Sequence, residues 1–317
     1  MSDISIVIVS YNVRDILARC LDSLQNAAPG RAIEVIVVDN ASNDGTGSMV
    51  REKYPAVRLL ANDSNRGFAA ASNQGIAASR GRSLLLLNPD TEILPGALAI
   101  LDEFIANEPD VGIVGPLLRY PNGDIQSSRR RFPTPLTALI ESTVVQRWFS
   151  RQSLLDRFYM ADRSAEQVQD VDWLVGACLL VRRRVIDEIG GLDERFFMYS
   201  EEVDWCRRAR AAGWRIVFVP TAEVVHHEGR SSEQNVVRRG QNFFESRCRY
   251  YEKHFGPDVG RALRLCLFVL TSFDLIEEGI KLSLGHRPAL RRSRLAARAA
   301  VLRYQWSKLS GYARDRC

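Results

Sequence analysis

The sequence predicts an α/β protein built on a mostly parallel, doubly wound sheet. Short apolar runs rich in β-branched residues alternate along the first third of the chain with segments of helical spacing. One of these runs, residues 83–87, is too short for a typical helix and ends abruptly at Asn88-Pro89-Asp90. A chain of 317 residues that is 46% hydrophobic can bury one large core or two modest ones.

The expected elements follow in chain order. Strands are predicted at 4–9, 33–38, 57–61, 83–87 and 111–115, with helices at 13–24, 44–53, 68–79 and 96–107. The alternation breaks near Pro116, and residues 116–170 mix proline, arginine and aromatic residues without a clear period. Regular signals resume at 172–181 and continue with a helix at 202–212, strands at 215–219 and 222–226, and a long helix at 235–254. From residue 260 the chain reads as amphipathic and strongly basic helix.

Bulk composition narrows the class of protein. The net charge is +5 and the isoelectric point is near 9.0, which favours anionic partners without indicating nucleic acid. The six cysteines are scattered without a Cys-x-x-Cys pair, so we expect neither a disulfide framework nor a zinc site. The run 4–9 is too short for a signal peptide, and 265–273 falls well below the ~20 residues that span a bilayer. We therefore expect a cytoplasmic protein that is soluble or lies on a membrane surface.

Polar residues follow four of the predicted strands. They are Ser10, Tyr11 and Asn12; Asp39; Asn65 and Gly67; and Asn88 and Asp90. The carboxyl ends of parallel strands share one edge of a sheet, where open α/β folds bind ligands. Asp39 is an acceptor suited to a base N–H or a ribose hydroxyl, and Gly67 lets an anion approach a helix N-terminus. Each turn alone is better explained as a turn or cap, but four together predict a nucleotide site.

A nucleotide diphosphate bound at this site would need a source of positive charge. No Gly-x-Gly-x-x-Gly follows the first strand and no Walker-type lysine loop occurs, which removes the main signals for dinucleotide oxidoreductases and P-loop phosphotransferases. A divalent cation held by Asp90 is the natural alternative, because Mg²⁺ typically takes one or two carboxylates together with phosphate oxygens.

Ordered motifs over residues 4–255 carry a resemblance to a known family. They are Val37-Val38-Asp39-Asn40-Ala41-Ser42-x-Asp44-Gly45-Thr46, Asn65-x-Gly67-Phe68-Ala69-x-x-x-Asn73, Leu87-Asn88-Pro89-Asp90, Gly176-Ala177 to Val181, Phe197-Met198-Tyr199-x-Glu201-Glu202-Val203-Asp204-x-Cys206-x-Arg208, Gly213-Trp214 and His226-x-x-Gly229-x-Ser231. In this order they resemble family 2 glycosyltransferases with the GT-A fold. The segment Gly123-x-x-Gln126-Ser127-x-Arg129-Arg130-Arg131-Phe132-Pro133 is further similar to bacterial rhamnosyltransferases that act on lipid-linked sugar diphosphates.

The resemblance implies an inverting sugar transfer from a nucleoside diphosphate sugar. The turn ending at Asp90 stands for the family's Asp-x-Asp motif, with Asn88 in place of the first acid, and Asn73 joins the donor-binding residues. Inversion needs a base on the far side from the metal, and the family places it where Glu202 stands. Glu201 and Asp204 remain alternative bases. Acids at a helix start also complement the helix dipole, which is the structural alternative.

Further site residues follow from the same resemblance. His226 is expected beside the metal, and because an imidazole is a softer ligand than Mg²⁺ prefers, Mn²⁺ is the other candidate cofactor. Adjacent His227 is expected on the opposite face of its strand. Trp173 and Gly176 are expected at the acceptor sugar, with a core role as the alternative for the tryptophan. Arg130 and Arg131 are expected to bind the acceptor's diphosphate, or to form a solvated basic loop.

The predicted organisation is a GT-A domain over 1–255 and a basic helical region over 256–317. The domain divides into a nucleotide-binding half, 1–115, and an acceptor half, 116–255. The expected donor is dTDP-rhamnose, and the expected acceptor is a glycan or a polyprenyl-diphosphate-linked sugar of the cell envelope. The C-terminal helices suit an anionic lipid surface at the inner face of the cell membrane. The alternatives are a cap on the catalytic domain and contact with a second copy in a homodimer.

Two rival functions use the same fold or site. A sugar-phosphate nucleotidyltransferase would show a glycine-rich loop with a basic residue after the first strand, which Ser10-Tyr11-Asn12 lacks. A non-catalytic sugar-nucleotide-binding protein would bind the donor tightly without transferring the sugar.

Overall fold

The computed structural model describes residues 3–141, 143–147, 153–228 and 236–314. By its internal contacts the chain forms two compact units. The first comprises residues 1–132 and 159–231, and the second comprises residues 133–158 and 232–317. Each unit is described by itself.

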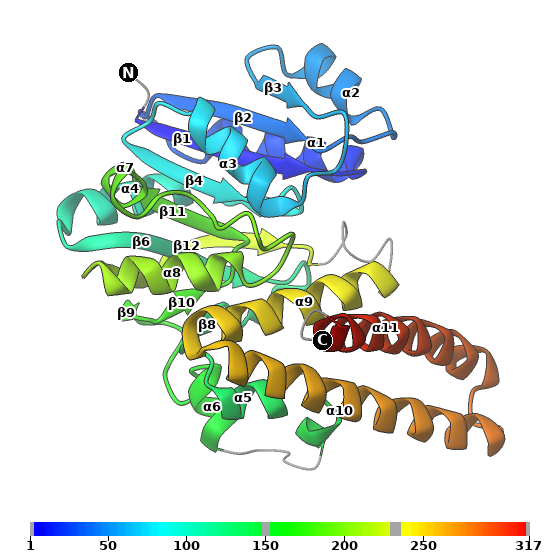
Figure 1. Cartoon of the computed structure of the whole chain (residues 1–317). Helices are drawn as coiled ribbons and strands as arrows, with labels where there is room; N and C mark the ends of the chain where they lie inside the picture. Colours follow the sequence, from blue (N-terminus) through cyan, green and yellow to red (C-terminus); the bar gives the residue numbers. More distant parts are fainter. Residues whose placement is uncertain (1–2, 142, 148–152, 229–235, 315–317) are drawn as a thin grey trace. The chain divides into compact units, whose positions relative to one another are not determined.

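The described residues of the first unit form a ten-stranded sheet (Figure 1). The order along the main path is β3-β2-β1-β4-β11-β6-β12-β5, with β7 added to β6 and β9 added to β12. The strands are β1 (Ile4–Ser10), β2 (Ile33–Asp39), β3 (Arg58–Ala61), β4 (Ser83–Leu87), β5 (Thr91–Ile93), β6 (Val111–Arg119), β7 (Ile125–Gln126), β9 (Gln169–Asp170), β11 (Cys178–Arg182) and β12 (Arg215–His226). Strands β3, β2, β1 and β4 are parallel, and β11 runs antiparallel to both its neighbours. A mostly parallel sheet of the predicted kind is therefore confirmed.

Helices cover both faces of this sheet. They are α1 (Arg14–Ser23), the 3₁₀ turn η1 (Leu24–Asn26), α2 (Thr46–Lys53), α3 (Phe68–Ala78), α4 (Ala97–Asn107), α7 (Arg183–Ile189) and α8 (Glu201–Ala211). The alternating residues Ile4, Ile6 and Ile8 of β1 join a buried cluster with α1, α2 and α4. On the other face, Val7 packs so closely against Gly75 of α3 that a Cβ on this glycine would lie 2.3 Å from it. Strand β1 is thus buried on both sides, as a central parallel strand should be.

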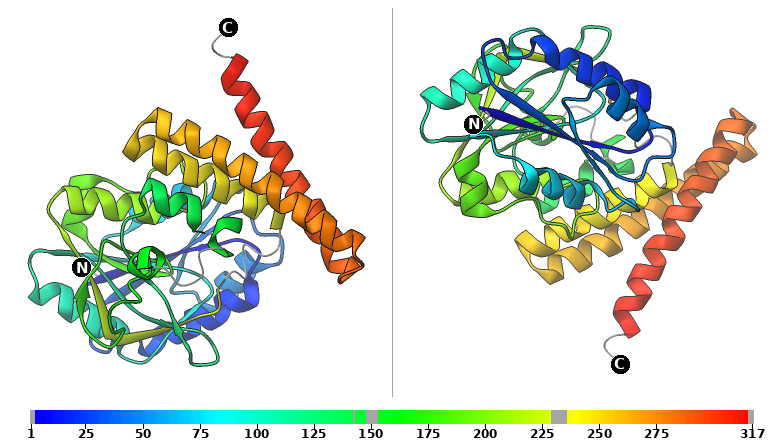
Figure 2. Two further views of the ribbon diagram at one scale, coloured as in Figure 1. Left: turned by 90° about the horizontal axis from the view of Figure 1, so that it is seen from below. Right: turned by 90° about the horizontal axis from the view of Figure 1, so that it is seen from above.

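The second unit is helical. It contains α5 (Pro135–Ile140), η2 (Val144–Arg147), α6 (Ser153–Phe158), α9 (Val236–Phe255), α10 (Pro257–Ser283) and α11 (Pro288–Arg314). Figure 2 shows α9 and α10 running side by side while α11 crosses them. Arg264 of α10 is buried and paired with Glu245 and Glu252 of α9, which fixes the two long helices against each other. Among the described residues, no helix is long and apolar enough to cross a bilayer.

Several predicted boundaries need correction. Residues 215–219 and 222–226 form one strand, β12, whose pairing with β6 shifts register between Val219 and Glu223, so Pro220 interrupts the pairing and not the strand. Strand β6 continues to Arg119, through Pro116. The regular segment 172–181 forms two strands, β10 (Trp173–Leu174) and β11, and β10 pairs with β8 (Arg129–Arg130) in a separate two-stranded sheet. Helix α9, assigned from the sequence to the GT-A domain, packs with α10 and α11 in the second unit, so the division at residue 255 stays a prediction.

Candidate active site

The ends of neighbouring parallel strands meet at one edge of the sheet. Ser10 at the end of β1 lies in register with Asp39 at the end of β2, and Ile8 is in register with Leu87 of β4, just before Asn88. Both Ser10 and Asp39 are buried, and the Ser10 Oγ has no hydrogen-bond partner within the described residues. The expected edge of polar strand ends is present, with a hydroxyl whose bonding capacity is left for a ligand or water.

The turns at this edge are held by side-chain hydrogen bonds to the backbone. Asp39 Oδ1 accepts from the N–H of Ser42, and Asn12, with a left-handed φ of 53°, accepts at Oδ1 from the N–H of Asn43. Tyr11 is half-buried beside Asn12. Since these contacts also satisfy ordinary turn geometry, they give the edge a fixed shape before any ligand binds.

Gly67 joins the nucleotide half to the segment before α8. Its φ is 86°, and a Cβ there would lie 2.5 Å from the carbonyl oxygen of Phe197. That same oxygen accepts a 2.7 Å hydrogen bond from the N–H of Phe68, the first residue of α3. Asn65 supports the turn by accepting from the Gly67 N–H. This position therefore requires glycine, for its backbone conformation and for the close approach of Phe197.

Asn73 has a different environment from the one expected. Its side-chain amide donates to the Leu192 carbonyl and to Glu194, and its Oδ1 accepts from the Leu192 N–H at 2.9 Å. The amide thus fixes α3 to the loop that follows α7. Its predicted contact with the donor stays a prediction, and the observed bonds favour a positioning role.

Asp90 and His226 come together through a strand pairing that sequence reasoning missed. The three-residue strand β5 follows Asp90 directly and pairs antiparallel with β12, placing Thr91 opposite His226. The His226 Nε2 lies 3.4 Å from Asp90 Oδ1, and Asp90 is only 5% exposed. His227 instead contacts Glu92 through its Nε2, while its N–H donates to the Asp90 carbonyl. Gly229 and Ser231, the rest of this motif, lie outside the described residues.

A second layer orients the histidine. His226 Nδ1 lies 2.8 Å from Gln126 Oε1, and the Gln126 amide donates to Glu228. The Gln126 amide oxygen accepts a hydrogen bond from the Nδ1–H of His226, and in that tautomer the Nε2 lone pair faces Asp90. Gln126 stood in the sequence motif that resembles rhamnosyltransferases, but its role as the support of His226 was not predicted.

The Asp90–His226 pair fits a cation that shares its coordination with a ligand. The described residues contain no group of three or more His, Cys, Asp or Glu side chains placed to hold a metal by themselves. A carboxylate oxygen and an imidazole nitrogen supply two ligands, and the remaining positions fall to phosphate oxygens and water. The donor set suits a divalent ion that binds together with a diphosphate.

The acidic cluster begins α8. It follows two non-glycine residues with left-handed backbone, Tyr199 (φ 73°) and Ser200 (φ 66°), an uncommon conformation that a surrounding structure must enforce. Glu201 is 5% exposed, and among the residues that the structure describes both Glu201 and Glu202 have an Oε2 atom without a hydrogen-bond partner. Burial raises the pKa of Glu201 well above its usual range, and the neighbouring Glu202 adds to the effect.

Glu202 keeps a more moderate proton affinity. Burial raises its pKa to about 6, while the helix N–H groups and the charge of Arg130 act in the opposite direction. Its neighbour is Gly176, where an added Cβ would lie 3.4 Å from the Glu202 side chain. Because 3.4 Å is ordinary van der Waals contact, the backbone at Gly176 lies directly beside the Glu202 side chain.

The same segment ties Glu202 to the strand end that carries Asp90. Ala177, next to Gly176, accepts at its carbonyl a 2.9 Å hydrogen bond from the N–H of Asn88. Glu202 therefore lies against Gly176, and the Asn88-Pro89-Asp90 turn is hydrogen-bonded to the next residue, Ala177. The two acidic motifs, over a hundred residues apart in sequence, belong to one constellation.

Asp204 lies in a closed environment. It is fully buried and forms a 2.9 Å ion pair with Arg208, whose guanidinium also donates to the carbonyls of Ile189 and Gly191. A carboxylate committed to such a pair holds α8 against the loop after α7. This placement favours Glu202 over Asp204 as the base.

The predicted acceptor residues Trp173 and Arg130 lie opposite each other on the paired strands β10 and β8. Arg130 lies over the ring of Tyr159, with its Cζ 4.6 Å from the ring centroid, and 5.9 Å from that of Trp173. The Trp173 indole donates to the Arg131 carbonyl, which fixes β10 to β8. The Arg131 side chain is partly exposed and lies 4.0 Å from Asp162. Strand pairing thus brings Trp173 and Arg130 together. The charge of Arg130 also lowers the pKa of the Glu202 carboxylate.

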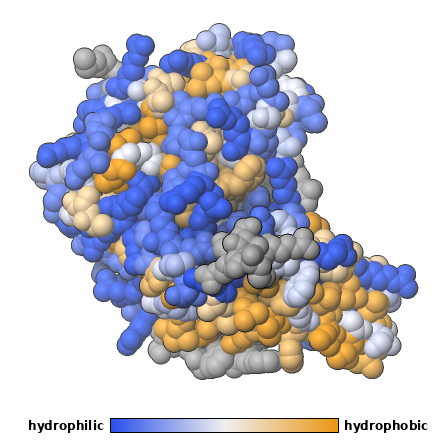
Figure 3. Space-filling model, in the orientation of Figure 1, coloured by the Kyte–Doolittle hydropathy of each residue, from blue (hydrophilic) through white to orange (hydrophobic). Residues whose placement is uncertain are grey.

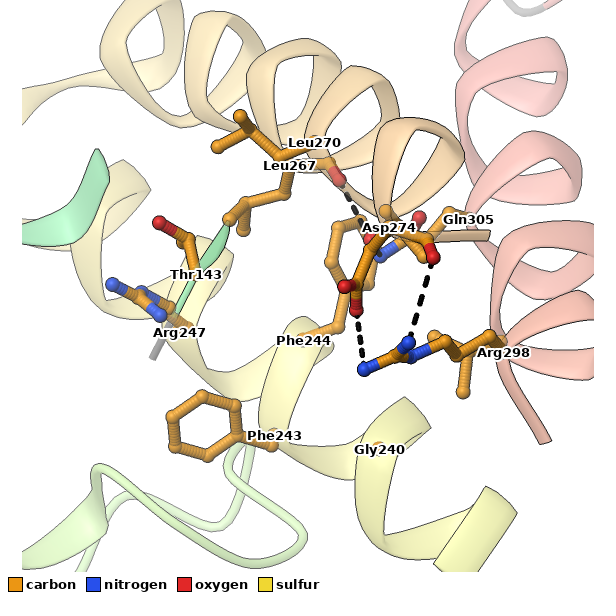
Figure 4. A pocket seen from close by; sticks show the side chains of 12 residues that line it. Thr143, Gly240, Phe243, Phe244, Arg247, Leu267, Leu270, Asp274, Arg298 and Gln305 are labelled. Carbon is orange, nitrogen blue, oxygen red and sulfur yellow. Dashed lines mark hydrogen bonds and ion pairs between the residues drawn. The ribbon is translucent and has the colours of Figure 1, made fainter. Parts of the chain in front are cut away.

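A pocket of about 260 Å³ lies elsewhere, in the helical unit (Figure 4). Phe243, Phe244 and Leu267 form apolar parts of its wall, and Arg298 points to Asp274 across a 2.6 Å ion pair. None of the predicted catalytic, donor, acceptor or metal residues lines it. We therefore place the candidate active site at the sheet edge and not in this pocket.

The sheet order and its flanking helices are those expected of a GT-A fold, and solved structures with similar folds were found. A mannosyltransferase from Pyrobaculum calidifontis, solved with GDP-Man and Mn²⁺, matches with a TM-score of 0.57 and 19% identity over 97% of this chain and 87% of that chain. GalNAc-T7, solved with UDP, GalNAc and Mn²⁺, matches with a TM-score of 0.57 and 17% identity over 80% of this chain and 48% of that one. The predicted GT-A fold is confirmed.

The sequence comparisons identify the family. The model of glycosyl transferase family 2 matches residues 5–190. A curated relative, the N-acetylglucosaminyl-diphospho-decaprenol L-rhamnosyltransferase of Mycobacterium tuberculosis, is 35% identical over 244 residues, which cover 73% of this chain and 78% of the relative. This chain belongs to glycosyl transferase family 2, and the predicted glycosyltransferase function is confirmed.

Proposed function

We propose that this enzyme transfers L-rhamnose from dTDP-rhamnose, with inversion, to a hydroxyl of a polyprenyl-diphosphate-linked sugar in cell-envelope synthesis. The substrate class is supported by the relative from M. tuberculosis, a rhamnosyltransferase that acts on N-acetylglucosaminyl-diphospho-decaprenol. The observation that carries the reaction type is the Gly176-Ala177 junction, which has Glu202 against one residue and the Asp90 turn bonded to the next.

Glu202 is the proposed general base. With a pKa of about 6 it is ionised at neutral pH, yet binds a proton more strongly than an exposed carboxylate does. It takes the proton of the acceptor hydroxyl as the hydroxyl oxygen forms a bond to the anomeric carbon. The bond from that carbon to the diphosphate breaks on the opposite face, and the nucleoside diphosphate leaves with the electron pair. One displacement of this kind inverts the anomeric configuration.

The remaining residues bind and orient the substrates. Asp39 and Ser10 are proposed to bind the nucleoside, with Tyr11, Asn12, Asn65 and Asn88 around it. Asp90 and His226 are proposed to hold a Mn²⁺ or Mg²⁺ ion, which supplies positive charge for the leaving diphosphate. Trp173 offers an apolar ring face to the acceptor sugar, and Arg130 and Arg131 offer guanidinium groups to its diphosphate.

The first test separates binding from chemistry. In Glu202→Gln the carboxamide keeps the shape of the side chain but cannot accept the proton, so we expect sugar transfer to fall by roughly 10²–10⁴-fold while dTDP binding, measured by calorimetric titration, stays unchanged. Glu103→Gln, an exposed glutamate of α4, is the matched control and should behave like the wild type. Retained transfer in Glu202→Gln would refute the assignment of the base.

The second test addresses the metal. Asp90→Asn should lose the Mn²⁺ dependence of dTDP binding as well as transfer, because the carboxamide offers the cation only a neutral oxygen. Full activity of the wild type in excess chelator would contradict a divalent cation. Analysis of product stereochemistry by NMR checks inversion directly.

The place of action is proposed from the acceptor. A polyprenyl-linked sugar is held in a membrane, so we place the enzyme in the cytoplasm at the inner face of the cell membrane. A homodimer, the other partner expected from the sequence, stays a prediction that sedimentation equilibrium can test.

A further inference from the structure

Helix α10 carries a long stripe of exposed apolar side chains. Its members are spaced three or four residues apart and are between 53 and 77% exposed: Leu265, Val269, Phe273, Ile276, Ile280 and Leu284. At about 1.5 Å of rise per residue the stripe runs for roughly 29 Å along one face of the helix. Figure 3 shows hydrophobic surface gathered over this part of the molecule, at the lower right. We call this face the α10 stripe.

The stripe lies opposite the face that α10 buries. Leu263, Leu267 and Glu278 are buried on that other face, where α10 packs against α9 and α11. A helix on the surface of a water-soluble unit ordinarily presents polar side chains outward. Six large apolar residues in one row exceed the scattered exposure that normal surfaces show, which marks an interaction surface.

Positive charge gathers next to the stripe. Residues 279–314, from the end of α10 to the end of α11, contain nine lysines and arginines and no aspartate or glutamate. Arg291 and Arg298 form ion pairs with the buried Glu278. Arg287 and Arg292, just beyond Leu284, are exposed. Apolar residues flanked by a purely basic segment are typical of helices that lie in the headgroup region of an anionic membrane.

An exposed aromatic residue of α11 lies beside α10. Trp306 is 60% exposed, and its ring lies 5.6 Å from that of Phe268 on α10. Tryptophan favours the boundary between headgroups and acyl chains, because its ring is apolar and its N–H needs a polar partner. It adds an anchor that suits lipid better than a dry protein contact.

The charge pattern also distinguishes between possible occupants. If two copies met through this face, the basic segments beside the two stripes, residues 279–314 of each copy, would be brought together, and like charges would repel. The three acids within the stretch of the stripe, Asp274, Glu277 and Glu278, each form an ion pair with a basic side chain. An anionic lipid surface gives the opposite sign over the whole area. We propose that the α10 stripe inserts into the headgroup region of an anionic membrane, with Arg287 and Arg292 on the lipid phosphates. This inference concerns binding to lipid alone and does not require the acceptor proposed above.

The test is co-sedimentation of the full chain with vesicles that contain no sugar acceptor. We expect binding to phosphatidylglycerol-containing vesicles and little binding to pure phosphatidylcholine. Ile276→Gln/Ile280→Gln should weaken the binding at least tenfold, since each isoleucine loses most of its transfer into the apolar phase. Arg287→Gln/Arg292→Gln should weaken it about fivefold per arginine, and this contribution should disappear in high salt.

Leu136→Gln provides the control, because it removes an apolar residue of similar exposure (55%) that belongs to α5 and not to the stripe. Circular dichroism verifies that each variant is folded, and transfer to a short water-soluble acceptor is measured separately. Three results would overturn the inference: a wild type that ignores anionic vesicles, a stripe variant that binds them as the wild type does, or a stripe variant that only converts a dimer to a monomer in sedimentation equilibrium. Failure of the proposed reaction would appear instead as lost transfer with vesicle binding intact.

Discussion

Glu201 and Glu202 are neighbours in sequence, but their surroundings give the two carboxyl groups different pKa values. Glu201 is buried to 5% exposure beside another acid, so the charged form is strongly disfavoured. Glu202 has the helix N–H groups and Arg130 to offset its burial, and the Gly176 backbone lies beside its side chain. The sequence predicted both acids as candidates, together with Asp204, but it could not rank them. The ranking depends on Arg208, Arg130 and Gly176, which reach the cluster from other elements.

The pH dependence of transfer should report the protonation of Glu202. Because a base acts only when it is ionised, kcat/KM should fall as the pH drops through about 6 and should level off above pH 7. Arg130 stabilises the ionised form, so Arg130→Gln should move this inflection to higher pH. Measurement of kcat/KM between pH 5 and 9 for both proteins checks this, and an unmoved inflection would mean that another group titrates.

Ionisation of the buried Glu201 should lower the free energy of unfolding at high pH. Its folded pKa is raised, so the folded state holds the proton more tightly than the unfolded chain, and stability is lost as the pH rises through that pKa. Glu201→Gln should therefore have a larger free energy of unfolding than the wild type at pH 8, and the difference should shrink as the pH falls toward 4. Urea unfolding at the two pH values measures this. Equal stabilities at pH 8 would show that the ionised form is already compensated.

At the scale of the element, the sequence pattern predicted the strands whose residues are contiguous and apolar. The strands at 4–9, 33–38 and 83–87 were found because continuous β-branched and leucine runs bounded by turns are typical of buried parallel strands. The three-residue β5 has too short a pattern to be recognised, yet its pairing with β12 brings His226 to Asp90. The residues between 116 and 170 were unreadable because β7 and β8 hold only two residues each and pair with distant partners.

Gly67 gives the element scale its prediction. Gly67 has a φ of 86°, which strains any residue with a side chain, and an added Cβ would lie 2.5 Å from the Phe197 carbonyl oxygen. Gly67→Ala should therefore separate α3 from the segment before α8. We expect a loss of roughly 2–4 kcal/mol in unfolding free energy and a marked drop in transfer. Gly30→Ala is the control, since its φ is 75° but no atom lies within 4 Å. It should cost only the backbone strain, about 1–2 kcal/mol, and leave transfer unchanged.

At the scale of the whole molecule, the chemistry and the lipid-facing surface fall in different units. The donor edge and the acidic cluster both belong to the unit built from residues 1–132 and 159–231. The α10 stripe belongs to the helical unit, which takes residues 133–158 from the middle of the chain. A sequence read in order predicts a boundary between consecutive segments, and it could not foresee that the helical unit is assembled from two separated pieces. The catalytic unit is also discontinuous, so its site forms only when residues over a hundred positions apart pack together.

This division predicts that donor binding stabilises one unit selectively. If the two units unfold as separate transitions in calorimetry, dTDP with MnCl₂ should shift only the transition of the catalytic unit. At about 100 times the dissociation constant the gain is roughly 2.7 kcal/mol, which is about 5–10 °C for a unit of this size. Asp90→Asn should abolish the Mn²⁺-dependent part of the shift, whereas Asp15→Asn, at an exposed acid of α1, should retain it. A shift of both transitions would mean that the units unfold together, and a full shift in Asp90→Asn would remove Asp90 from the metal site.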